Sequence, residues 1–181
     1  QALFQDLAIQ MGLARPVSLV VSENAPSPIT LGLLHPLVIL PPLDADQEKL
    51  IWILRHELAH QAGGHLWCKL LLLLARAVHW FNPLVHQMAR QAARDLELAC
   101  DNRVVAGASP VQRRAYARTL LAALETASAS TTSLSTPWQG GSSMMKQRFH
   151  NLFSPIPRRR GRMLPAIALA AVLCLGGLVS C

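Results

Sequence analysis

The segment "RHELAHQAGG", residues 55–64, constrains the fold of this chain more than any other stretch. It places His56 and His60 four residues apart, with Glu57 directly after the first histidine. Side chains four residues apart project from the same side of an α-helix. We therefore predict a helix from about residue 45 to residue 61 that presents both imidazoles on one face. Three further features support it: an apolar stripe (Leu50, Ile53, Leu54, Leu58), a capping pair (Asp44, Gln47) and a glycine stop (Gly63, Gly64).

Two histidines on one helical face can bind a single Zn²⁺ ion. Glu57 is offset by one residue, so it can lie beside a zinc-bound water instead of taking a ligand position. Zinc lowers the pKa of such a water to about 7. Glu57 then fits a catalytic role, accepting the proton of the attacking water and passing it to the leaving amine of a peptide bond. A catalytic zinc site needs a third protein ligand and one open position, so another segment must supply a ligand.

The third ligand is predicted in "RDLELACDNRVV", where Glu97 and Asp101 are four residues apart and share a helical face. Glu97 can reach the zinc, and Asp101 can accept the free N–H of a zinc-bound histidine. Asp95 points to a different face of that helix, where solvent is the expected environment. A local alternative, the metzincin pattern, needs histidine at the position of Leu66 and is rejected.

The remaining histidines and cysteines give weaker signals. His79 and His86 flank "WFNP", and either could stabilise the oxyanion that forms on the substrate carbonyl, although a packed or surface role is the more common one. Cys68 and Cys100 are expected to be small buried side chains, and no disulfide framework is predicted. The other histidines are weaker candidates still (His35, His65, His150).

The rest of the chain predicts an α+β fold that is mostly helical. Residues 17–40 alternate in a way that predicts two or three short strands, with a hairpin-like break at His35-Pro36. One of these strands could run beside the histidine helix and pair with a peptide substrate, or be purely structural. Further helices are predicted at about 1–14, 65–81, 84–105 and 110–127. The helix at 65–81 is very apolar and is expected to be buried or to graze a membrane.

The C-terminal third predicts a membrane attachment. The peptidase domain is assigned to residues 1–127, a Ser/Thr/Gly-rich linker to 128–143 and a basic juxtamembrane segment to 144–162. Residues 163–181 carry no charge. As a helix they would reach roughly 28 Å, about the thickness of the bilayer core, so we expect a transmembrane helix. The arginines between residues 158 and 162 place the globular part on the cytoplasmic side by the positive-inside rule.

Composition agrees with this assignment. The chain is 51% hydrophobic and only 15% charged, with a net charge of +7. Much of the basic charge lies beside the apolar C-terminal run, which favours a lipid bilayer over direct binding to nucleic acid. The sequence begins with Gln1, as expected of a fragment or a processed chain.

Four motifs, in order, carry a resemblance to a known family: "SPITLGLLHPLVILPP", "RHELAH", "HWFNPLVH" and "ELACDNRVV". They resemble the BlaR/MecR-type membrane zinc metallopeptidases, regulatory sensor-transducers of bacterial β-lactam resistance that act as antirepressors. The resemblance covers about residues 10–180. It identifies His56 and His60 as zinc ligands, Glu57 as the catalytic glutamate, Glu97 as the third ligand and Asp101 as the last residue of the ExxCD motif.

The resemblance implies a gluzincin domain on the cytoplasmic side of the bacterial inner membrane, within a multi-pass protein. Family members of known role cleave themselves or a cytoplasmic DNA-binding repressor after an outside signal. We therefore expect a zinc metalloendopeptidase that acts on a protein substrate in signal transduction, and the oligomeric state, a homodimer included, stays open. The alternative is a non-enzymatic membrane adaptor whose metal is structural, with Cys100 or His86 as a fourth ligand.

Overall fold

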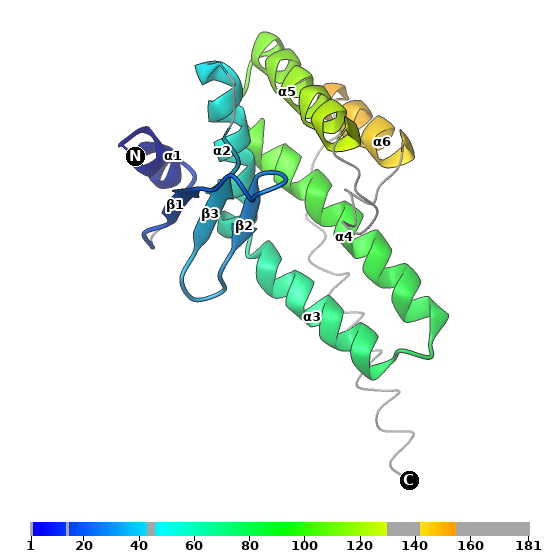
Figure 1. Cartoon of the computed structure of the whole chain (residues 1–181). Coiled ribbons are helices and arrows are strands. Elements are labelled where there is room, and N and C mark those ends of the chain that lie inside the picture. Colours follow the sequence, from blue (N-terminus) through cyan, green and yellow to red (C-terminus); the bar gives the residue numbers. More distant parts are fainter. Residues whose placement is uncertain (1, 14, 43–45, 130–141, 155–181) are drawn as a thin grey trace.

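The computed structural model describes residues 2–13, 15–42, 46–129 and 142–154 (Figure 1). These residues are mostly helical and include one three-stranded sheet, which confirms the predicted α+β class. The elements follow in the order α1 (Ala2–Gln10), β1 (Ser18–Val21), β2 (Ile29–Leu31), β3 (Leu37–Leu40), α2 (Gln47–Ala62), α3 (His65–Val78), α4 (Pro83–Val104), α5 (Pro110–Ala129) and α6 (Ser142–Phe153).

The sheet has β3 at its centre, with β1 parallel to it on one side and β2 antiparallel on the other. A tight turn joins β2 to β3, as predicted from the His35-Pro36 break. Gly32 in this turn has a φ of +82°, and a Cβ there would lie 1.9 Å from the His35 carbonyl oxygen. Glycine is therefore required at this position. β2 is an edge strand beside α2, and the Gln61 side chain of α2 donates to the Leu31 carbonyl at 2.9 Å.

Helix α2 begins with a side-chain cap, but not the predicted one. Asp46 accepts a hydrogen bond from the Lys49 backbone N–H at 2.8 Å, so it occupies the N-cap position. Asp44, the predicted cap, lies outside the described residues, and the helix starts at Gln47. α2 contributes to both hydrophobic cores of the molecule: Leu54 and Leu58 pack with α1 and the sheet, and Trp52 and Ala59 pack with α4, α5 and α6.

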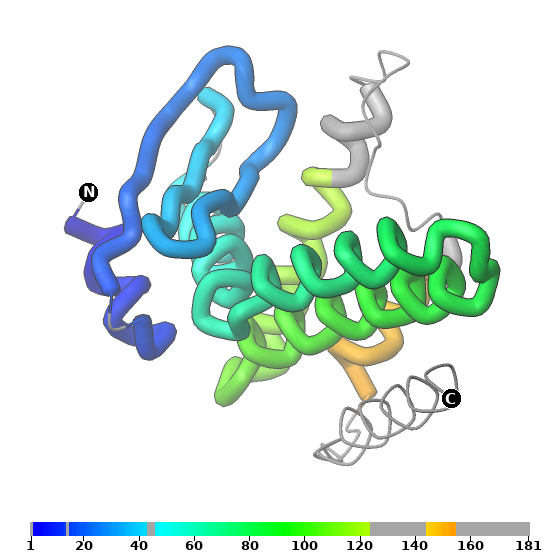
Figure 2. Tube along the Cα trace, turned by 90° about the horizontal axis from the view of Figure 1, so that it is seen from below, coloured from blue at the N-terminus to red at the C-terminus, as the bar shows by residue number. Residues whose placement is uncertain are grey.

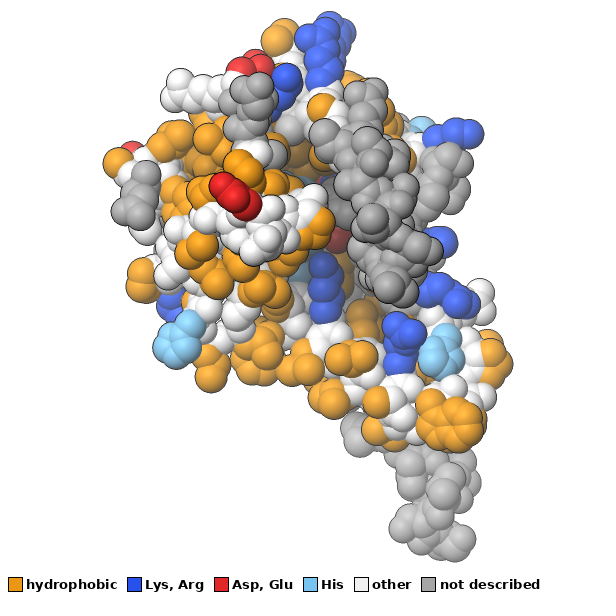
Figure 3. Space-filling model, in the orientation of Figure 1, with side chains coloured by type: hydrophobic (Ala, Val, Ile, Leu, Met, Phe, Trp, Pro, Cys, Tyr) orange, Lys and Arg blue, Asp and Glu red, His pale blue; other side chains and the backbone are white. Residues whose placement is uncertain are grey.

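Helices α3 and α4 form a long antiparallel hairpin, seen side by side in Figures 1 and 2. The turn ends at Asn82, whose side chain caps α4 by accepting from the Leu84 N–H at 3.0 Å, and Pro83 occupies the first turn of α4. His65 is the one buried residue of α3. The prediction of a buried helix at 65–81 is therefore wrong for this chain, and apolar side chains lie exposed along the hairpin in the lower part of Figure 3.

Helices α5 and α6 close the second core. The predicted capping box starts α5: the Gln112 N–H donates to Ser109 Oγ at 3.3 Å, and the Ser109 N–H donates to Gln112 Oε1 at 2.8 Å. α6 packs against α4 and α5, and Leu152 is fully buried among them. Residues 144–153, which the sequence assigned to a juxtamembrane segment, thus form part of the packed domain.

No helix of the described part of the chain is both long and apolar enough to cross a bilayer. The predicted transmembrane helix at 163–181, the end of the basic segment and most of the predicted linker lie outside the described residues.

Candidate metal centre

Helix α2 brings three polar side chains into the interior. His56, Glu57 and His60 are 5%, 7% and 7% exposed. They are buried because α2 lies between the sheet on one side and α4 and α5 on the other. The two imidazoles meet edge to face, with ring centroids 4.9 Å apart. The helical spacing has therefore placed both rings on one face, as the sequence predicted.

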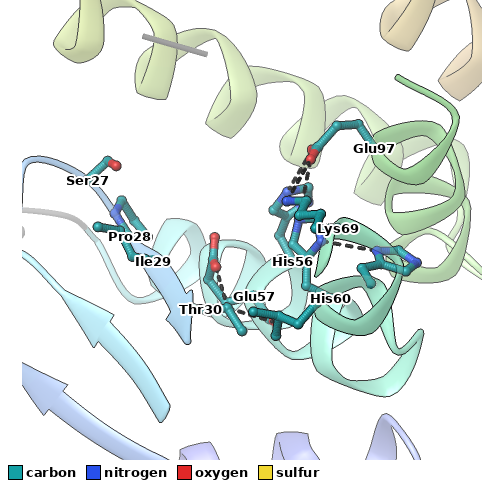
Figure 4. A pocket seen from close by; sticks show the side chains of 11 residues that line it. Ser27, Pro28, Ile29, Thr30, His56, Glu57, His60, Lys69 and Glu97 are labelled. Atoms are coloured by element: carbon teal, nitrogen blue, oxygen red, sulfur yellow. Dashed lines mark hydrogen bonds and ion pairs between the residues drawn. The ribbon is translucent and has the colours of Figure 1, made fainter. Parts of the chain in front are cut away.

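Glu97 of α4 completes this group. Its carboxylate points at both rings (Figure 4), with Oε2 3.7 Å from His56 Nε2 and Oε1 3.7 Å from His60 Nε2. Two ligands of a tetrahedral zinc at about 2.1 Å lie roughly 3.4 Å from each other. The donor types and these two distances are therefore compatible with a metal ion bound between His56, His60 and Glu97.

Burial and charge set the protonation of these ligands. Burial, together with the neighbouring His56, lowers the pKa of His60 to about 3, so this ring is neutral near pH 7 and can donate a lone pair. Burial would raise the pKa of the Glu97 carboxyl, but the His56 imidazole and other cationic neighbours outweigh it and hold the pKa well below its usual value. Burial opposes the charging of His56, yet Cys100 and Glu97 outweigh it and raise its pKa. A metal ion would take the place of that proton.

A hydrogen-bond chain fixes the tautomer of His56. Tyr116 of α5 donates its hydroxyl proton to Asp101 Oδ1 at 2.6 Å, and its oxygen lies 2.8 Å from His56 Nδ1. Because the hydroxyl has only one proton, Nδ1 is the donor in the second bond, which leaves the Nε2 lone pair for a metal. The predicted direct contact from Asp101 is longer, 3.7 Å to Nδ1, because Tyr116 lies closer. Burial and the Asp101 charge raise the pKa of Tyr116 and keep it protonated.

Arg148 of α6 pairs with the same aspartate. Its Nε and Nη2 donate to the two carboxylate oxygens of Asp101 at 2.7 and 2.6 Å. Its Nη1 lies 3.9 Å from Glu97 Oε2. Arg148 and Asp101 are both 0% exposed, so the pair is fully removed from water. α6 is thereby connected to the metal ligand on α4.

His60 has a partner of its own. Its Nδ1 lies 3.0 Å from Nδ1 of His65, the first residue of α3. His65 fits there because Gly63 has no side chain: a Cβ at Gly63 would lie 2.3 Å from His65 Nε2. Burial lowers the pKa of His65, so it also favours the neutral form. The contact leaves His60 Nε2 facing Glu97.

Cys100 provides an alternative ligand. His56, His60 and Cys100 offer ligand atoms that all lie within 4.8 Å of one another, so this cluster could also hold a metal ion. The Cys100 Sγ lies 3.4 Å from His56 Nδ1 and 3.9 Å from Nε2. Cys100 is fully buried, as predicted, and burial raises the pKa of its thiol, whereas Cys68 is exposed and the same prediction is wrong for it. Metals bind the thiolate, so the Glu97 carboxylate is the better third donor at neutral pH.

The ligands open into a pocket of about 230 Å³ between α2, α3, α4 and the loop that leads into β2. Glu57 lies in it, and Thr30 of β2 donates to Glu57 Oε2 at 2.5 Å (Figure 4). Lys69 of α3 lies at its border, with Nζ 3.7 Å from Glu97 Oε1. The lining is completed by residues of the loop before β2, of β2 itself and of the first turn of α3 (Ser27, Pro28, Ile29, His65, Leu66). The pocket thus places a carboxylate, a cation and an edge strand around the candidate metal ligands.

The structure does not bring His79 and His86 to this pocket. Both lie at the far end of the hairpin, where His86 Nε2 bonds to the Trp80 carbonyl at 2.8 Å. Along the helix axes, His79 is about 21 Å from His65 and His86 is about 16 Å from Glu97. Their predicted contact with the substrate oxyanion therefore has no support in this geometry. Asp95 is exposed, as predicted, and accepts from Gln91 at 3.1 Å.

Several site residues escaped the sequence analysis. Arg148 had a local signal, since it shares the helical face of Met145 and Leu152, where an arginine must be paired if buried. Tyr116 is the chain's one tyrosine, but nothing in its neighbours points to His56. Thr30 and Lys69 depend on contacts between distant segments. The site residues that the structure adds are Thr30, His65, Lys69, Tyr116 and Arg148.

Comparisons with known proteins identify the family of this chain. The family model described as "BlaR1 peptidase M56" matches residues 2–152. The regulatory protein BlaR1 of Bacillus licheniformis is 34% identical over 104 residues, which are 55% of this chain and 17% of that protein. The methicillin resistance mecR1 proteins of Staphylococcus aureus and Staphylococcus epidermidis are 25% identical over 92 residues, 49% of this chain and 16% of theirs. The match therefore spans about a sixth of each relative. Because the family model covers the chain from α1 into α6, this protein belongs to the BlaR1 peptidase M56 family of metallopeptidase-type hydrolases.

Proposed function

We propose that this chain is the catalytic domain of a membrane-bound zinc metalloendopeptidase. The observation that carries the proposal is the position of the Glu97 carboxylate, 3.7 Å from a ring nitrogen of both His56 and His60. Two imidazoles and one carboxylate leave a fourth position open, which is the arrangement of catalytic rather than structural zinc sites. When bound, zinc would supply a Lewis acid that acidifies water and polarises a peptide carbonyl.

The chain's own residues then have defined tasks. Glu57 accepts the proton of the attacking water and delivers it to the leaving amine. Thr30 donates to one oxygen of Glu57, Oε2, and so orients the carboxylate and leaves Oε1 for proton transfer. Tyr116 and His65 hold the two ligand rings with their Nε2 atoms toward Glu97. Lys69 places a positive charge at the pocket wall. There it stabilises the negative charge that develops on the oxygen of the substrate carbonyl.

The substrate would be an extended polypeptide. β2 is the edge strand of the sheet, and its residues Ile29 and Thr30 line the pocket beside Glu57. An extended peptide can add to such an edge through backbone hydrogen bonds, which would bring its scissile bond to the metal centre. We propose that the substrate is this protein itself or a cytoplasmic DNA-binding repressor.

The relatives support a proposal for the cellular setting. BlaR1 is named a regulatory protein, and mecR1 is named for methicillin resistance. We propose the same kind of circuit here: a multi-pass protein of the bacterial inner membrane, with the peptidase domain on the cytoplasmic side, that relays a β-lactam signal. No direct contact with nucleic acid belongs to this proposal, and a homodimer remains compatible with it.

The test measures zinc and cleavage in the same samples of the full chain, with fluorescein-labelled casein as the probe. Glu57→Gln should retain one equivalent of zinc and lose about 10²–10⁴-fold in cleavage rate, as expected for loss of a general base. Glu97→Ala should lose the zinc. The matched control is Glu48→Gln, on the exposed first turn of the same helix, which should change neither quantity. A His56→Ala variant that kept both bound metal and full activity would overturn the ligand assignment.

A second candidate is a non-enzymatic adaptor with a structural metal, and one observation favours it: Cys100 lies within ligand range of His56 and His60. With Glu97 it would give four protein ligands and a closed site. Four-ligand coordination predicts a thiolate–metal charge-transfer band when Co²⁺ replaces zinc. No such band, together with cleavage of the labelled casein, would exclude the adaptor.

A further inference from the structure

The hairpin of α3 and α4 has an unusual surface. Apolar side chains, each about half or more exposed, follow α3, continue over the turn and run onto α4 (Figure 3). Contiguous exposed apolar area of this kind marks an interaction surface in most proteins. We call this set the hairpin surface: Trp67, Leu71, Leu74, Val78, Trp80, Phe81, Leu84 and Met88.

Charge of one sign covers α3 and the first half of α4, before the acidic residues Asp95, Glu97 and Asp101 of α4. The sequence contains no aspartate or glutamate between Glu57 and Asp95, whereas four basic residues fall in that interval, Lys69, Arg76, Arg90 and Arg94. Each Lys or Arg close to an anionic lipid surface adds to the attraction between protein and bilayer. The outer part of the hairpin, which is apolar and carries Arg76 and Arg90 without an acidic residue, therefore complements anionic lipid.

Several polar groups at the tip of the hairpin are paired with one another. His86 Nε2 donates to the Trp80 carbonyl at 2.8 Å, and His86 Nδ1 accepts from Arg76 Nε at 3.3 Å. The Asn82 side chain pairs with the Leu84 N–H. Backbone groups that enter a bilayer must be satisfied within the protein, because lipid offers no partner. His86 thus has a structural task at the tip, where two large aromatic side chains, Trp80 and Phe81, are 74% and 67% exposed.

We propose that the hairpin surface docks tip-first on an anionic lipid bilayer, with Trp80 and Phe81 at the boundary of headgroups and acyl chains. Tryptophan and phenylalanine side chains favour that depth. The inference rests on the membrane location in the proposed function and adds which face of the domain meets the lipid. The pocket lies at the opposite end of the hairpin, beside the first turns of α3, so docking leaves it open to a substrate.

The experiment measures the depth of single labels on the full chain. Cys68, Cys174 and Cys181 are replaced by serine, and one new cysteine carries the fluorophore NBD, at Trp80→Cys or Phe81→Cys. The control is Val111→Cys on α5, an apolar position that is 72% exposed. The proteins are reconstituted in vesicles of phosphatidylcholine with phosphatidylglycerol. NBD at residues 80 and 81 should be blue-shifted and quenched several-fold more by nitroxide lipids than NBD at 111, and several-fold less by aqueous iodide.

Three results would overturn the inference. Equal iodide quenching at 80, 81 and 111 in chains that float with the vesicles would leave the membrane location intact and refute the docking face. A blue shift at residue 80 that grows with protein concentration in the absence of lipid would identify a second copy as the occupant. Unchanged nitroxide quenching in vesicles of phosphatidylcholine alone would refute the role of the basic residues. Neither zinc nor activity enters these readings, so they are independent of the catalytic proposal.

Discussion

The pair of Arg148 and Asp101 makes the sharpest stability prediction. Both side chains are fully buried, two hydrogen bonds of 2.6 and 2.7 Å join them, and Tyr116 supplies a further bond to the same carboxylate. Arg148→Met keeps much of the side-chain volume and removes the charge. Asp101 would then lose its charged partner in the interior and keep the hydrogen bond from the Tyr116 hydroxyl.

Removing one partner of a buried ion pair costs about 3–5 kcal/mol in the free energy of unfolding. In a chain of this length, 1 kcal/mol shifts the melting temperature by about 2–4 °C, so Arg148→Met should melt roughly 6–20 °C lower. The measurement is thermal unfolding followed by circular dichroism in the presence of a chelator, so that metal binding does not contribute. Arg114→Met, an exposed arginine on the adjacent α5, is the control and should stay within about 0.5 kcal/mol of the parent.

A double variant separates the ion pair from general loss of packing. Asp101→Asn in the Arg148→Met background removes the uncompensated charge, so the double variant should be more stable than the sum of the two single losses predicts. Strict additivity would refute the reasoning, as would a melting temperature of Arg148→Met equal to that of the Arg114→Met control. Either result would mean that the pair is not desolvated in solution as the structure has it.

Two further variants test the surroundings of the metal ligands. In Gly63→Ala the new methyl would displace His65 from His60, and loss of such a supporting contact weakens metal affinity about 10–100-fold. Competition with a zinc chelator measures it, and Gly63→Ala should add little to a His65→Ala background. Cys100→Ala should retain one equivalent of zinc by elemental analysis, because Glu97 is the proposed third ligand. Loss of zinc from Cys100→Ala, with the fold intact by circular dichroism, would instead favour the structural site.

Short-range patterns were enough for the core of the candidate site. His56, Glu57 and His60 needed only a helix, and their relation depends on residues within one turn. Glu97 was found for the same reason, since the four-residue spacing to Asp101 places both on one face of α4. The structure brings these residues together as the helical periodicity predicts.

Local sequence patterns did not determine the N-cap of α2 or the positions of His79 and His86. Asp44 and Asp46 both precede α2 and both can cap a helix, so the sequence alone could not decide between them, and Asp46 has the position. The positions of His79 and His86 depend on topology. Because the chain turns at Asn82 between two antiparallel helices, both histidines lie at one end of the hairpin and the candidate ligands lie at the other. The lengths of these two helices therefore place both histidines away from the metal ligands.

The network around Asp101 makes α6 part of the metal centre. Arg148 contacts Asp101 and lies near Glu97, while Asp101 reaches the His56 ligand through Tyr116. Linkage between two equilibria is reciprocal. A change in the free energy of α6 packing caused by metal binding therefore implies an equal change in metal affinity caused by α6 packing. α6 is also the last described element before the basic residues 158–162 and the apolar run 163–181. The last described helix before residues 158–181 is thus joined to the ligands through the buried hydrogen bonds of Arg148, Asp101, Tyr116 and His56.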